Sequence, residues 1–417
     1  MKSTDKMNRK TPWMLLFLLF LLPAASQAQA PHVLGQYQDE APLRTWNVFG
    51  PLTASQAAMG GTRYARSFDL SASQTNPSLL SRLPQVTAVL SGYWQRAELF
   101  QYGPVNTGIL SSAENIAHDT TLLDFGGVAV NTKGWGLALT VSINDLLERP
   151  PSGATISEFN TPVYSFAYVQ DGYIRTFNLG LARRITPRLS VGIGLNHESG
   201  WLERATVEEM IYGGITIADS KKLTIESYYL NAGVTFDATD TITLAAVVRT
   251  PYTRKAEGES SVSNTTPPAT DIRIEVAAES SYKQPLIVGA GADIALTERF
   301  HWAVDAGFFN WKSYQADYFG EELDRCLKNV VTLHTGLEYT QPFTMFNQEF
   351  RLPLWLGFTY DPQPVACVDS SYTYFTGGLG LRHRHFHLEV GGMLGSEHGT
   401  GDDLKAYRVA ATAGFRY

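Results

Sequence analysis

TASQAAMGGTRYARSFDLSASQTNPSLLSRL, residues 53–83, is the stretch of sequence that decides the fold. It is rich in Ala, Gly and Ser, and such small side chains bury too little apolar surface to build a core of their own. A segment of this composition must pack inside something larger. We therefore interpret residues 31–84 as a plug, or hatch, and residues 85–417 as a surrounding barrel.

The composition favours a membrane β-barrel over a soluble globular protein. Charged residues make up 18% of the 417 residues, below the roughly 25% of an average soluble protein. Aromatic residues reach 12%, and the mean hydropathy is only -0.12. No segment after the N-terminal region approaches the ~20 apolar residues of a membrane-spanning helix. A membrane barrel has this composition because only every second residue of a strand meets lipid.

The N-terminus predicts a cleaved signal peptide over residues 1–30. Basic residues precede the apolar run 13–22, and A-Q-A at 28–30 is a small-x-small cleavage site. The apolar run is too short for a membrane anchor helix. Removing the leader's net +3 from the formal charge of -7 leaves about -10 for the mature chain, which disfavours nucleic acid as a partner.

From residue 85 onward the sequence repeats an alternating strand, a short turn, a second strand and a longer polar connection. Fourteen strands result, the even number that a closed bacterial barrel requires. We keep residues 270–296 as one kinked strand despite Pro285, because two strands would break the parity. The strands are expected at 85–96, 120–131, 133–144, 172–184, 187–198, 223–237, 240–251, 270–296, 299–312, 328–341, 350–361, 373–383, 385–395 and 404–417.

The lengths of the connections orient the barrel. Short turns at one end are typical of the periplasmic side, and long loops are typical of the outside. A soluble, secreted β-sandwich or propeller would not need this regular alternation. We expect a somewhat longer turn at 341–349. The long outside connections are expected at 97–119, 145–171, 199–222, 252–269, 313–327, 362–372 and 396–403.

The last strand, LKAYRVAATAGFRY at 404–417, shows the alternation most clearly. One face carries Tyr407, Val409, Phe415 and Tyr417 and is expected to meet lipid, whereas the other meets the lumen. The predicted fold class is therefore all-β: a 14-stranded antiparallel transmembrane β-barrel with an N-terminal plug.

Several stretches in order resemble the long-chain fatty-acid transporter (FadL/TodX) outer-membrane family. The likeness covers most of the mature chain, with Asn-Pro-Ser at 76–78 where that family has Asn-Pro-Ala, and with a longer leader at 31–52. The outside loops are shorter than the helical loops that bind ligand in better-known members. The stretches that carry the likeness are AAMGGTRYARSFDLSASQTNPSLL at 57–80, NLGLARRITPRLSVGIGLN at 178–196, VVRTPY at 247–252, QPLIVGAGADIALTERFHWAVDAGFFNW at 284–311 and LPLWLGFTYDPQPV at 352–365.

The resemblance implies a monomeric outer-membrane channel of a Gram-negative bacterium that takes up hydrophobic, fatty-acid-like molecules passively. In the family the hatch blocks the periplasmic side, and a kinked early strand opens the wall so that the solute leaves sideways into lipid. Here that strand would be 133–144. The expected partners are a hydrophobic small-molecule ligand and outer-membrane lipid, with no cofactor and no metal.

Five residues of the hatch are candidate gating residues. Gly60 and Gly61 allow tight backbone turns. Pro77 fixes its φ angle, and Asn76 can bond its own backbone, so Asn76-Pro77-Ser78 marks a bend. An ordinary turn is the alternative explanation. We expect deletion of residues 76–78 to abolish uptake while the barrel still assembles.

The sequence offers little support for an enzyme. It has no G-x-S-x-G elbow. His383, His385 and His387 have the i, i+2, i+4 spacing of a metal site, but interfacial polar residues explain them better. Cys326 and Cys367 fall in consecutive outside loops, and we expect them to form a disulfide because that compartment is oxidising.

A second function remains open: a related barrel could serve as a docking or shuttle component of a secretion system, without small-molecule transport. The two functions share the hatch, so the sequence separates them poorly. Bound lipid or detergent in an apolar lumen would favour the channel, and co-isolation with secretion subunits would favour the alternative.

Overall fold

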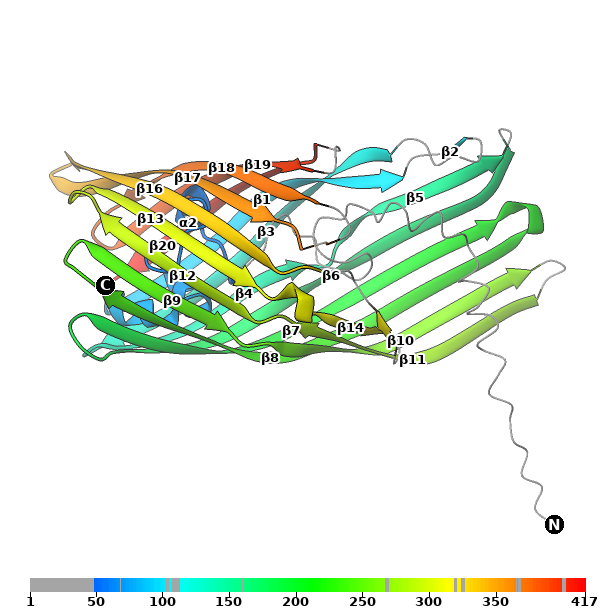
Figure 1. The fold of residues 1–417 in the computed structure, drawn as a ribbon, viewed down its shortest axis with the longest axis horizontal. Coiled ribbons are helices and arrows are strands. Elements are labelled where there is room, and N and C mark those ends of the chain that lie inside the picture. Colours follow the sequence, from blue (N-terminus) through cyan, green and yellow to red (C-terminus); the bar gives the residue numbers. More distant parts are fainter. Residues whose placement is uncertain are drawn as a thin grey trace, which may run out of the picture.

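The chain forms a closed antiparallel β-barrel of 14 strands, which confirms the expected all-β, 14-stranded barrel. The ring closes where the first strand, β1, pairs along its length with the last strand, β20. In Figure 1 the short turns gather at one end of the barrel and helix α2 lies within the ring. The computed structural model describes residues 49–67, 69–102, 105–106, 113–158, 161–266, 270–318, 321–323, 327–364, 366, 369–399 and 403–417.

The described secondary structure is almost entirely β. The wall consists of β1(Val86–Tyr102), β3(Ala113–Thr132), β4(Trp135–Leu146), β6(Thr161–Arg184), β7(Leu189–Met210), β8(Ile215–Asp237), β9(Ile242–Arg249), β10(Tyr252–Thr266), β11(Thr270–Gln284), β12(Ile287–Ala295), β13(Phe300–Phe309), β14(Gln315–Tyr318), β16(Val330–Met345), β17(Gln348–Pro362), β18(Ser371–Arg382), β19(Phe386–His398) and β20(Lys405–Arg416). β5(Arg149–Glu158) continues the wall beyond β4 and pairs with β6. The remaining short elements are β2(Val105–Asn106), β15(Glu321–Leu323), α2(Ala54–Ala58), η2(Leu70–Gln74), η3(Pro77–Arg82), η4(Ile211–Gly213) and η5(Trp311–Ser313).

Four wall strands are interrupted along their length. β6 pairs with β4 near the short turns and with β5 farther out, so β4 and β5 form one broken strand. β8 pairs with β9 near the short turns and with β10 farther out, so β9 and β10 form one broken strand. β12 and β11 form the next strand, and the break between them falls at Pro285, as expected from its missing N–H. β13 and β14 are likewise two parts of one strand. Counted in this way, the wall strands match the predicted order.

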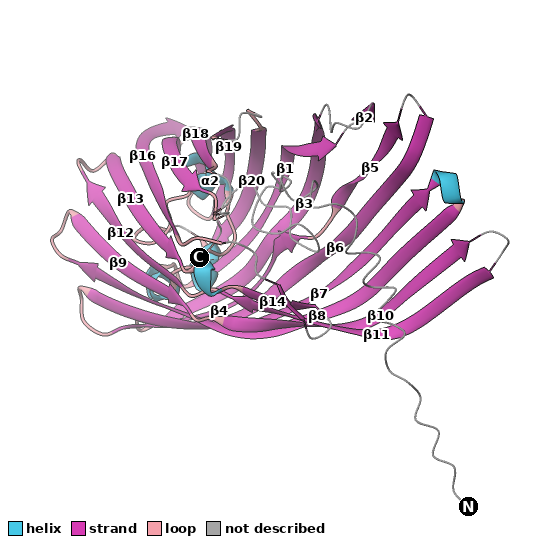
Figure 2. Ribbon diagram, turned by 45° about the vertical axis from the view of Figure 1, so that its right-hand side comes forward, coloured by secondary structure: helices cyan, strands magenta, loops and turns pink. Residues whose placement is uncertain are grey.

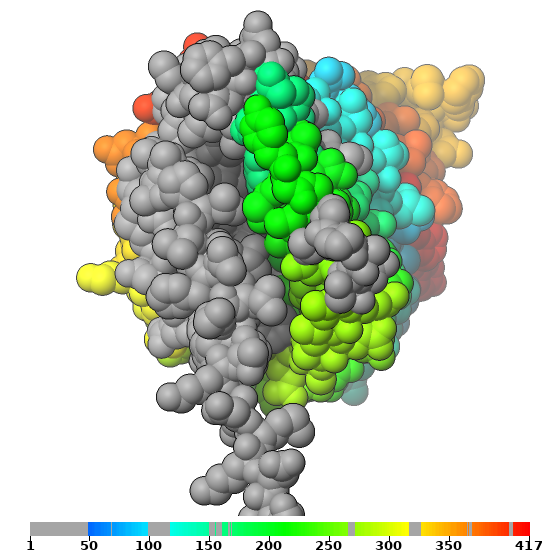
Figure 3. Space-filling view, turned by 90° about the vertical axis from the view of Figure 1, so that its right-hand side faces the viewer, coloured from blue at the N-terminus to red at the C-terminus, as the bar shows by residue number. Residues whose placement is uncertain are grey.

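The expected long outside loops are largely wrong, because strands occupy much of that sequence. Residues 252–269 were expected to be a connection, yet β10 runs to Thr266 and pairs with β8 and β11. Most of 199–222 also belongs to β7 and β8, which are joined only by η4. The wall from β6 to β11 therefore rises well beyond the rest (Figures 1 and 2), and Figure 3 looks onto this end.

The turn expected at 341–349 is in fact a tight hairpin. β16 and β17 stay paired from Gln341–Leu352 to Met345–Gln348. Phe346 and Asn347 form the two-residue tip with φ of 54° and 59°, the paired positive values of a type I′ turn. Strand pairing thus continues through residues that looked like a loop.

Inward and outward faces alternate as predicted for the last strand. In β20, Ala406, Arg408 and Ala410 are buried toward the lumen, whereas Val409 is 46% exposed on the outside. Similar outward apolar residues circle the barrel, among them Leu90, Leu139, Leu230 and Leu388. We call this belt the outer apolar band. None of the helices in the described part of the chain is long and apolar enough to cross a bilayer.

A charge placed in the outer apolar band should destabilise the barrel in lipid. We expect Leu230→Arg on β8 to lower the free energy of unfolding by about 2–4 kcal/mol, the cost of a cation on the lipid face near the bilayer midplane. Thr224→Arg, on the same face of β8 but above the band, should change it by less than about 1 kcal/mol. Urea unfolding in lipid vesicles measures both, and equal effects would contradict a lipid-facing band.

Candidate functional site in the barrel lumen

Residues 49–83, which we call the inner segment, fold into three short helices whose caps the sequence supplies. Thr53 and Gln56 form a capping box at the start of α2. Asp69 caps η2 by accepting a hydrogen bond from Ser71 N at 2.8 Å. Asp69 also accepts from the Thr53 hydroxyl at 2.7 Å, so it ties η2 to the start of α2. Local capping therefore holds the segment compact without a core of its own.

Helix α2 rests on inward-facing glycines of the wall. A Cβ atom at Gly391 of β19 would collide with the Ala54 carbonyl oxygen, and one at Gly357 of β17 with the Gly60 backbone. Thr376 of β18 donates its hydroxyl to Ala58 O at 2.8 Å and accepts from Gly60 N at 2.9 Å. The missing side chains let backbone meet backbone.

A second set of glycines receives η2 and η3 on the opposite side of the ring. A Cβ atom at Gly136 of β4 would lie 2.6 Å from Leu80 O. Gly192 of β7 and Gly233 of β8 would likewise collide with Pro77 and Asn76. Asn131 of β3 donates to Leu83 O at 2.8 Å. The inner segment thus contacts strands around the whole ring.

The predicted glycine pair lies at one of these contacts. Gly60 and Gly61 have φ of 66° and 80°, a conformation that side chains other than glycine rarely adopt. A Cβ at Gly60 would lie 2.5 Å from Thr335 O. The Gly60 carbonyl accepts from Thr359 Oγ1 at 2.6 Å and is 2.8 Å from His334 Nδ1. The geometry explains why glycine is needed here; the part of this pair in gating stays a prediction.

Asn76, Pro77 and Ser78 join the inner segment to β8. The Asn76 amide donates to Tyr64 O at 2.6 Å and to Thr235 Oγ1 at 2.9 Å, and its oxygen accepts from Ser78 N at 3.2 Å. Ser78 Oγ lies 2.6 Å from the same Thr235 hydroxyl. Pro77 begins η3, where its missing N–H costs nothing. The bend is therefore a cap with a tether to the wall.

Charged side chains of the wall hold the middle of the inner segment. Asp305 of β13 accepts from the backbone N–H groups of Arg63 at 2.6 Å and Tyr64 at 2.9 Å. Arg66 donates to Asp293 at 3.1 Å and Glu338 at 2.9 Å. Burial raises the pKa of the Tyr64 hydroxyl well above its usual value, which keeps that phenol neutral.

Gln74 bridges the inner segment to an irregular part of β4. Its Nε2 donates to Thr140 Oγ1 at 3.1 Å, and its Oε1 accepts from Ser142 Oγ at 2.8 Å and Asn144 Nδ2 at 3.3 Å. The pairing of β4 with β6 shifts register at Asn144. Among the described residues, the ladder between β3 and β4 ends just below, at the Phe125–Ser142 pair. We call this end of the ladder the β3–β4 seam.

Above the inner segment, the lumen face of β6, β7 and β8 first carries a row of three asparagines. Asn178 donates to Asn196 at 2.8 Å, Asn196 to Asn231 at 2.7 Å, and Asn231 to the backbone oxygen of Ser73 at 3.1 Å. All three side chains are buried. The row forms a polar layer directly against the inner segment.

A buried charged cluster forms the next layer. Arg254 of β10 donates to both carboxylate oxygens of Glu198 at 2.7 Å and to Asp145 at 2.5 Å. Tyr252 and Ser227 donate to the same Glu198 carboxylate at 2.9 and 2.5 Å. Each charge has an opposite partner, as burial demands.

Farther out, the same strands turn apolar toward the lumen. One rung up, Ile174 and Ile225 flank Gly200, and the next rung pairs Leu202 with Leu223. These side chains belong to one buried apolar cluster with Trp311 and with Phe49 of the inner segment. Polar residues such as Lys221 follow at the rim. We call this layer the inner apolar band, defined by Ile174, Leu202, Leu223, Ile225, Ala256 and Ala278.

Arg249 differs from the neighbouring Arg254 in lacking a carboxylate. It is only 9% exposed, and among the described residues its Nε has no hydrogen-bond partner and no carboxylate is within salt-bridge distance. The guanidinium carbon lies 5.7 Å and 5.5 Å from the ring centres of Tyr229 and Tyr252, which are stacked on each other. Arg249 is thus a buried cation packed against two aromatic faces.

Other predicted residues lie elsewhere. The three histidines do not share a face: His387 is buried toward the lumen, whereas His385 stacks on outward-facing Phe415 and Tyr417. Their spacing does not place them on one face because β19 begins only at Phe386, so His385 belongs to the turn. Cys326 and Cys367 lie outside the described residues, as does the expected signal peptide, and the disulfide stays a prediction.

Sequence reasoning missed Asp305, Glu198, Arg249 and Arg254. Each occupies an inward position in an otherwise alternating strand, where a small or apolar residue would cost less. That contrast is a usable signal. Inward glycines on neighbouring strands, such as Gly192 and Gly233, are a second signal that would have traced the footprint of the inner segment.

These features define a class: a closed fourteen-stranded barrel with the inner segment packed against the inside of its wall and an apolar band in its lumen. The same fold occurs in a Pseudomonas aeruginosa FadL homologue, with 12% identity, 88% of this chain and 99% of that chain covered, and a TM-score of 0.65. The Pseudomonas putida toluene transporter TodX follows with 13% identity, 89% and 99% coverage and a TM-score of 0.62.

The CymD monoaromatic hydrocarbon channel is also similar, at 11% identity with 89% and 98% coverage and a TM-score of 0.61. No protein-family model matches the sequence, and no curated protein sequence matches it significantly. The expected resemblance to the FadL/TodX fold is confirmed. At these identities the likeness establishes the fold.

Substituting Gly60 should loosen the inner segment without unfolding the barrel. In Gly60→Ala, the added Cβ meets the Thr335 carbonyl, and the positive φ is strained as well. We expect limited proteolysis to cut residues 49–83 at least several times faster, while heat-modifiable migration shows an intact barrel. Gly392→Ala, where a Cβ has room, is the matched control. Equal protection of both variants would contradict the role of this contact.

Proposed function

We propose that the protein is an outer-membrane channel for the passive uptake of hydrophobic small molecules. The observation that carries this proposal is the inner apolar band, a set of inward-facing apolar residues in a membrane-type barrel. A barrel that conducted only water and ions would gain nothing from such a layer. The similar structures include a toluene transporter and a monoaromatic hydrocarbon channel, which supports the same class of solute.

The inner segment acts as the hatch in this proposal, with residues 31–48 completing the predicted plug of 31–84. Its many hydrogen bonds to the wall oppose free movement, so opening requires a local rearrangement. Gly60, Gly61, Asn76, Pro77 and Ser78 form two of its anchors and are the proposed gating residues. The compact caps described above allow the segment to shift as a unit.

The β3–β4 seam is the proposed side exit. A solute in the inner apolar band meets polar and charged layers on its way toward the short turns. At the seam, the strand ladder ends and β4 is bulged at Asn144. Gln74 is bonded to β4 at this place from the inside, so movement of the hatch and opening of the wall would be coupled. This position falls at the end of the strand 133–144 expected from the sequence.

Arg249 is the proposed partner for an acidic head group. A buried cation is costly unless it is paired, and Arg249 has no carboxylate partner among the described residues. A fatty-acid-like ligand would bring a carboxylate to it. In this proposal the channel works as a monomer without catalytic chemistry, and a Cys326–Cys367 disulfide would join outside loops.

Uptake by cells tests the channel proposal directly. A bacterial strain that lacks its own fatty-acid channel and expresses this protein should take up radiolabelled oleate or toluene faster than the vector control. Deleting residues 76–78 removes the tether to Thr235, and we expect uptake at the vector level with normal heat-modifiable migration. Wild-type uptake in the deletion would contradict the hatch role, and no uptake by the wild type would contradict the channel.

Replacing Arg249 should separate acidic from neutral solutes. We expect Arg249→Gln to weaken oleate binding by at least about tenfold, since hydrogen bonds to charged groups contribute about 1.5–3 kcal/mol. Binding of methyl oleate should stay within about twofold. Equilibrium binding to the purified barrel measures both. Arg183→Gln is the control, because Arg183 stacks on Trp135 on the outer surface; a loss for both ligands would contradict a head-group role.

A further inference from the structure

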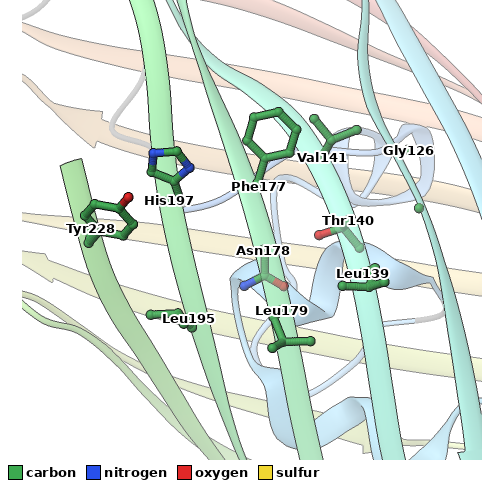
Figure 4. A pocket seen from close by; sticks show the side chains of 11 residues that line it. Gly126, Leu139, Thr140, Val141, Phe177, Asn178, Leu179, Leu195, His197 and Tyr228 are labelled. Atoms are coloured by element: carbon green, nitrogen blue, oxygen red, sulfur yellow. The ribbon is translucent and has the colours of Figure 1, made fainter. Parts of the chain in front are cut away.

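A shallow hollow of about 530 Å³ lies on the outside of the barrel wall, across five neighbouring strands. Figure 4 shows side chains from β4, β6, β7 and β8 around it. Its outward residues are large and exposed: Leu139 is 58%, Leu195 50% and Tyr228 63% exposed. The hollow is lined by Gly126, Gly127, Leu139, Thr140, Val141, Phe177, Asn178, Leu179, Leu195, His197 and Tyr228.

The floor of the hollow is low because β3 contributes glycine where its neighbours contribute side chains. Gly126 pairs with Val141 of β4. A Cβ atom at Gly126 would sit at an ordinary 3.5 Å from Leu90, so no backbone crowding demands glycine there. The absence of a side chain therefore shapes the outer surface rather than relieving strain inside the wall.

One end of the hollow coincides with the upper edge of the outer apolar band. Phe177, His197 and Tyr228 pair across β6, β7 and β8 as a single rung, and their rings stack at 6.2 and 4.5 Å. The next rung on the same face, farther from the short turns, is polar, with Arg175 beside Ser199. Aromatic rungs at such a boundary mark the level of the lipid head groups.

Toward the short turns, the hollow leads into the outer apolar band. Below the aromatic rung, Leu179 pairs with Leu195 and then Leu195 with Leu230. The residues that line the hollow include no aspartate, glutamate, lysine or arginine. The hollow thus starts at head-group level and descends along apolar side chains, as a lipid molecule does in one leaflet.

We propose that this hollow is a binding site for a membrane lipid, with an acyl chain lying in it and the head group level with Arg175. The inference rests on the membrane location proposed above, not on transport. Two observations favour a lipid over a protein partner: the site is continuous with the outer apolar band, and its lining has no charge to specify a polypeptide. A bound acyl chain would cover the outer surface of the wall at Thr140. Gln74 contacts the Thr140 side chain from the lumen.

Native mass spectrometry of the purified full-length barrel tests the site. The protein is stripped with detergent and titrated with dioleoyl phosphatidylglycerol. We expect the wild type to retain one lipid molecule after washing. Leu139→Trp and Leu195→Trp fill the hollow and should lower this retention at least fivefold. Leu354→Trp places the same side chain in the outer apolar band on β17, away from the hollow, and should retain lipid as the wild type does.

The outcomes separate this site from the channel proposal. No lipid on the wild type, or unchanged retention in both filled variants, would overturn the inference. Loss of oleate binding with phosphatidylglycerol retained in the filled variants would also overturn it, because the occupant would then be a transported solute. Cellular uptake by the filled variants is measured in parallel; if the wild type fails to take up any solute, the channel proposal falls while the lipid site stands or falls on the retained mass.

Discussion

Contact between the backbone of the inner segment and inward-facing glycines of the wall is the interaction on which the rest of the structure depends. A ring of fourteen strands is wider than its own side chains can fill. Glycine in a strand costs roughly 0.5–1 kcal/mol in conformational entropy. Gly192, Gly233, Gly357 and Gly391 accept this cost at places where the segment approaches too closely for any Cβ. The wall is therefore shaped around its contents.

The polarity of the inner segment follows from the same arrangement. Its backbone and its Ser, Thr, Asn and Gln side chains are buried, and buried polar groups must be hydrogen-bonded. The wall supplies partners at matching heights: Thr376 for α2, Thr140 for η2 and Thr235 for η3. An apolar plug could fill the same space, but it would lack the specific position that these hydrogen bonds define.

The sequence predicted the wall because period-two alternation and short turns are local signals. Pro285 was placed correctly as a break within one strand, since a missing N–H acts wherever the chain goes. The tall strands were missed because their outward residues lie above the outer apolar band: in β10, Lys255, Glu257 and Glu259 face water and resemble a loop. Buried and exposed positions still alternate there, but polar residues occur on both faces, so the sequence shows no clear alternation of apolar and polar residues.

The lumen site was harder to predict because its partners are distant in sequence. Gly60 and Asn76 were found through backbone chemistry that depends only on the residue itself. Glu198 and Arg254 are 56 residues apart and meet only through the register of β7, β8 and β10. Arg249 has no carboxylate partner to find among the described residues. A site made of long-range pairs needs the register before it can be recognised.

In the proposed channel, the order of layers in the lumen would set the direction in which an apolar solute travels. A solute that leaves the inner apolar band toward the short turns must pass Glu198, Arg254 and then the asparagine row. There it loses about 25 cal/mol of hydrophobic free energy for each Å² of its apolar surface that is no longer in apolar contact. The solute would also have to break hydrogen bonds in those layers. Breaking them would leave buried charges unpaired. Passage through the wall at the proposed β3–β4 exit would avoid these layers. Gln74 is bonded to Thr140, Ser142 and Asn144 of β4 together, so it can move only by giving up hydrogen bonds beside the bulge and at it. The same side chain would therefore keep the hatch in place and the wall closed.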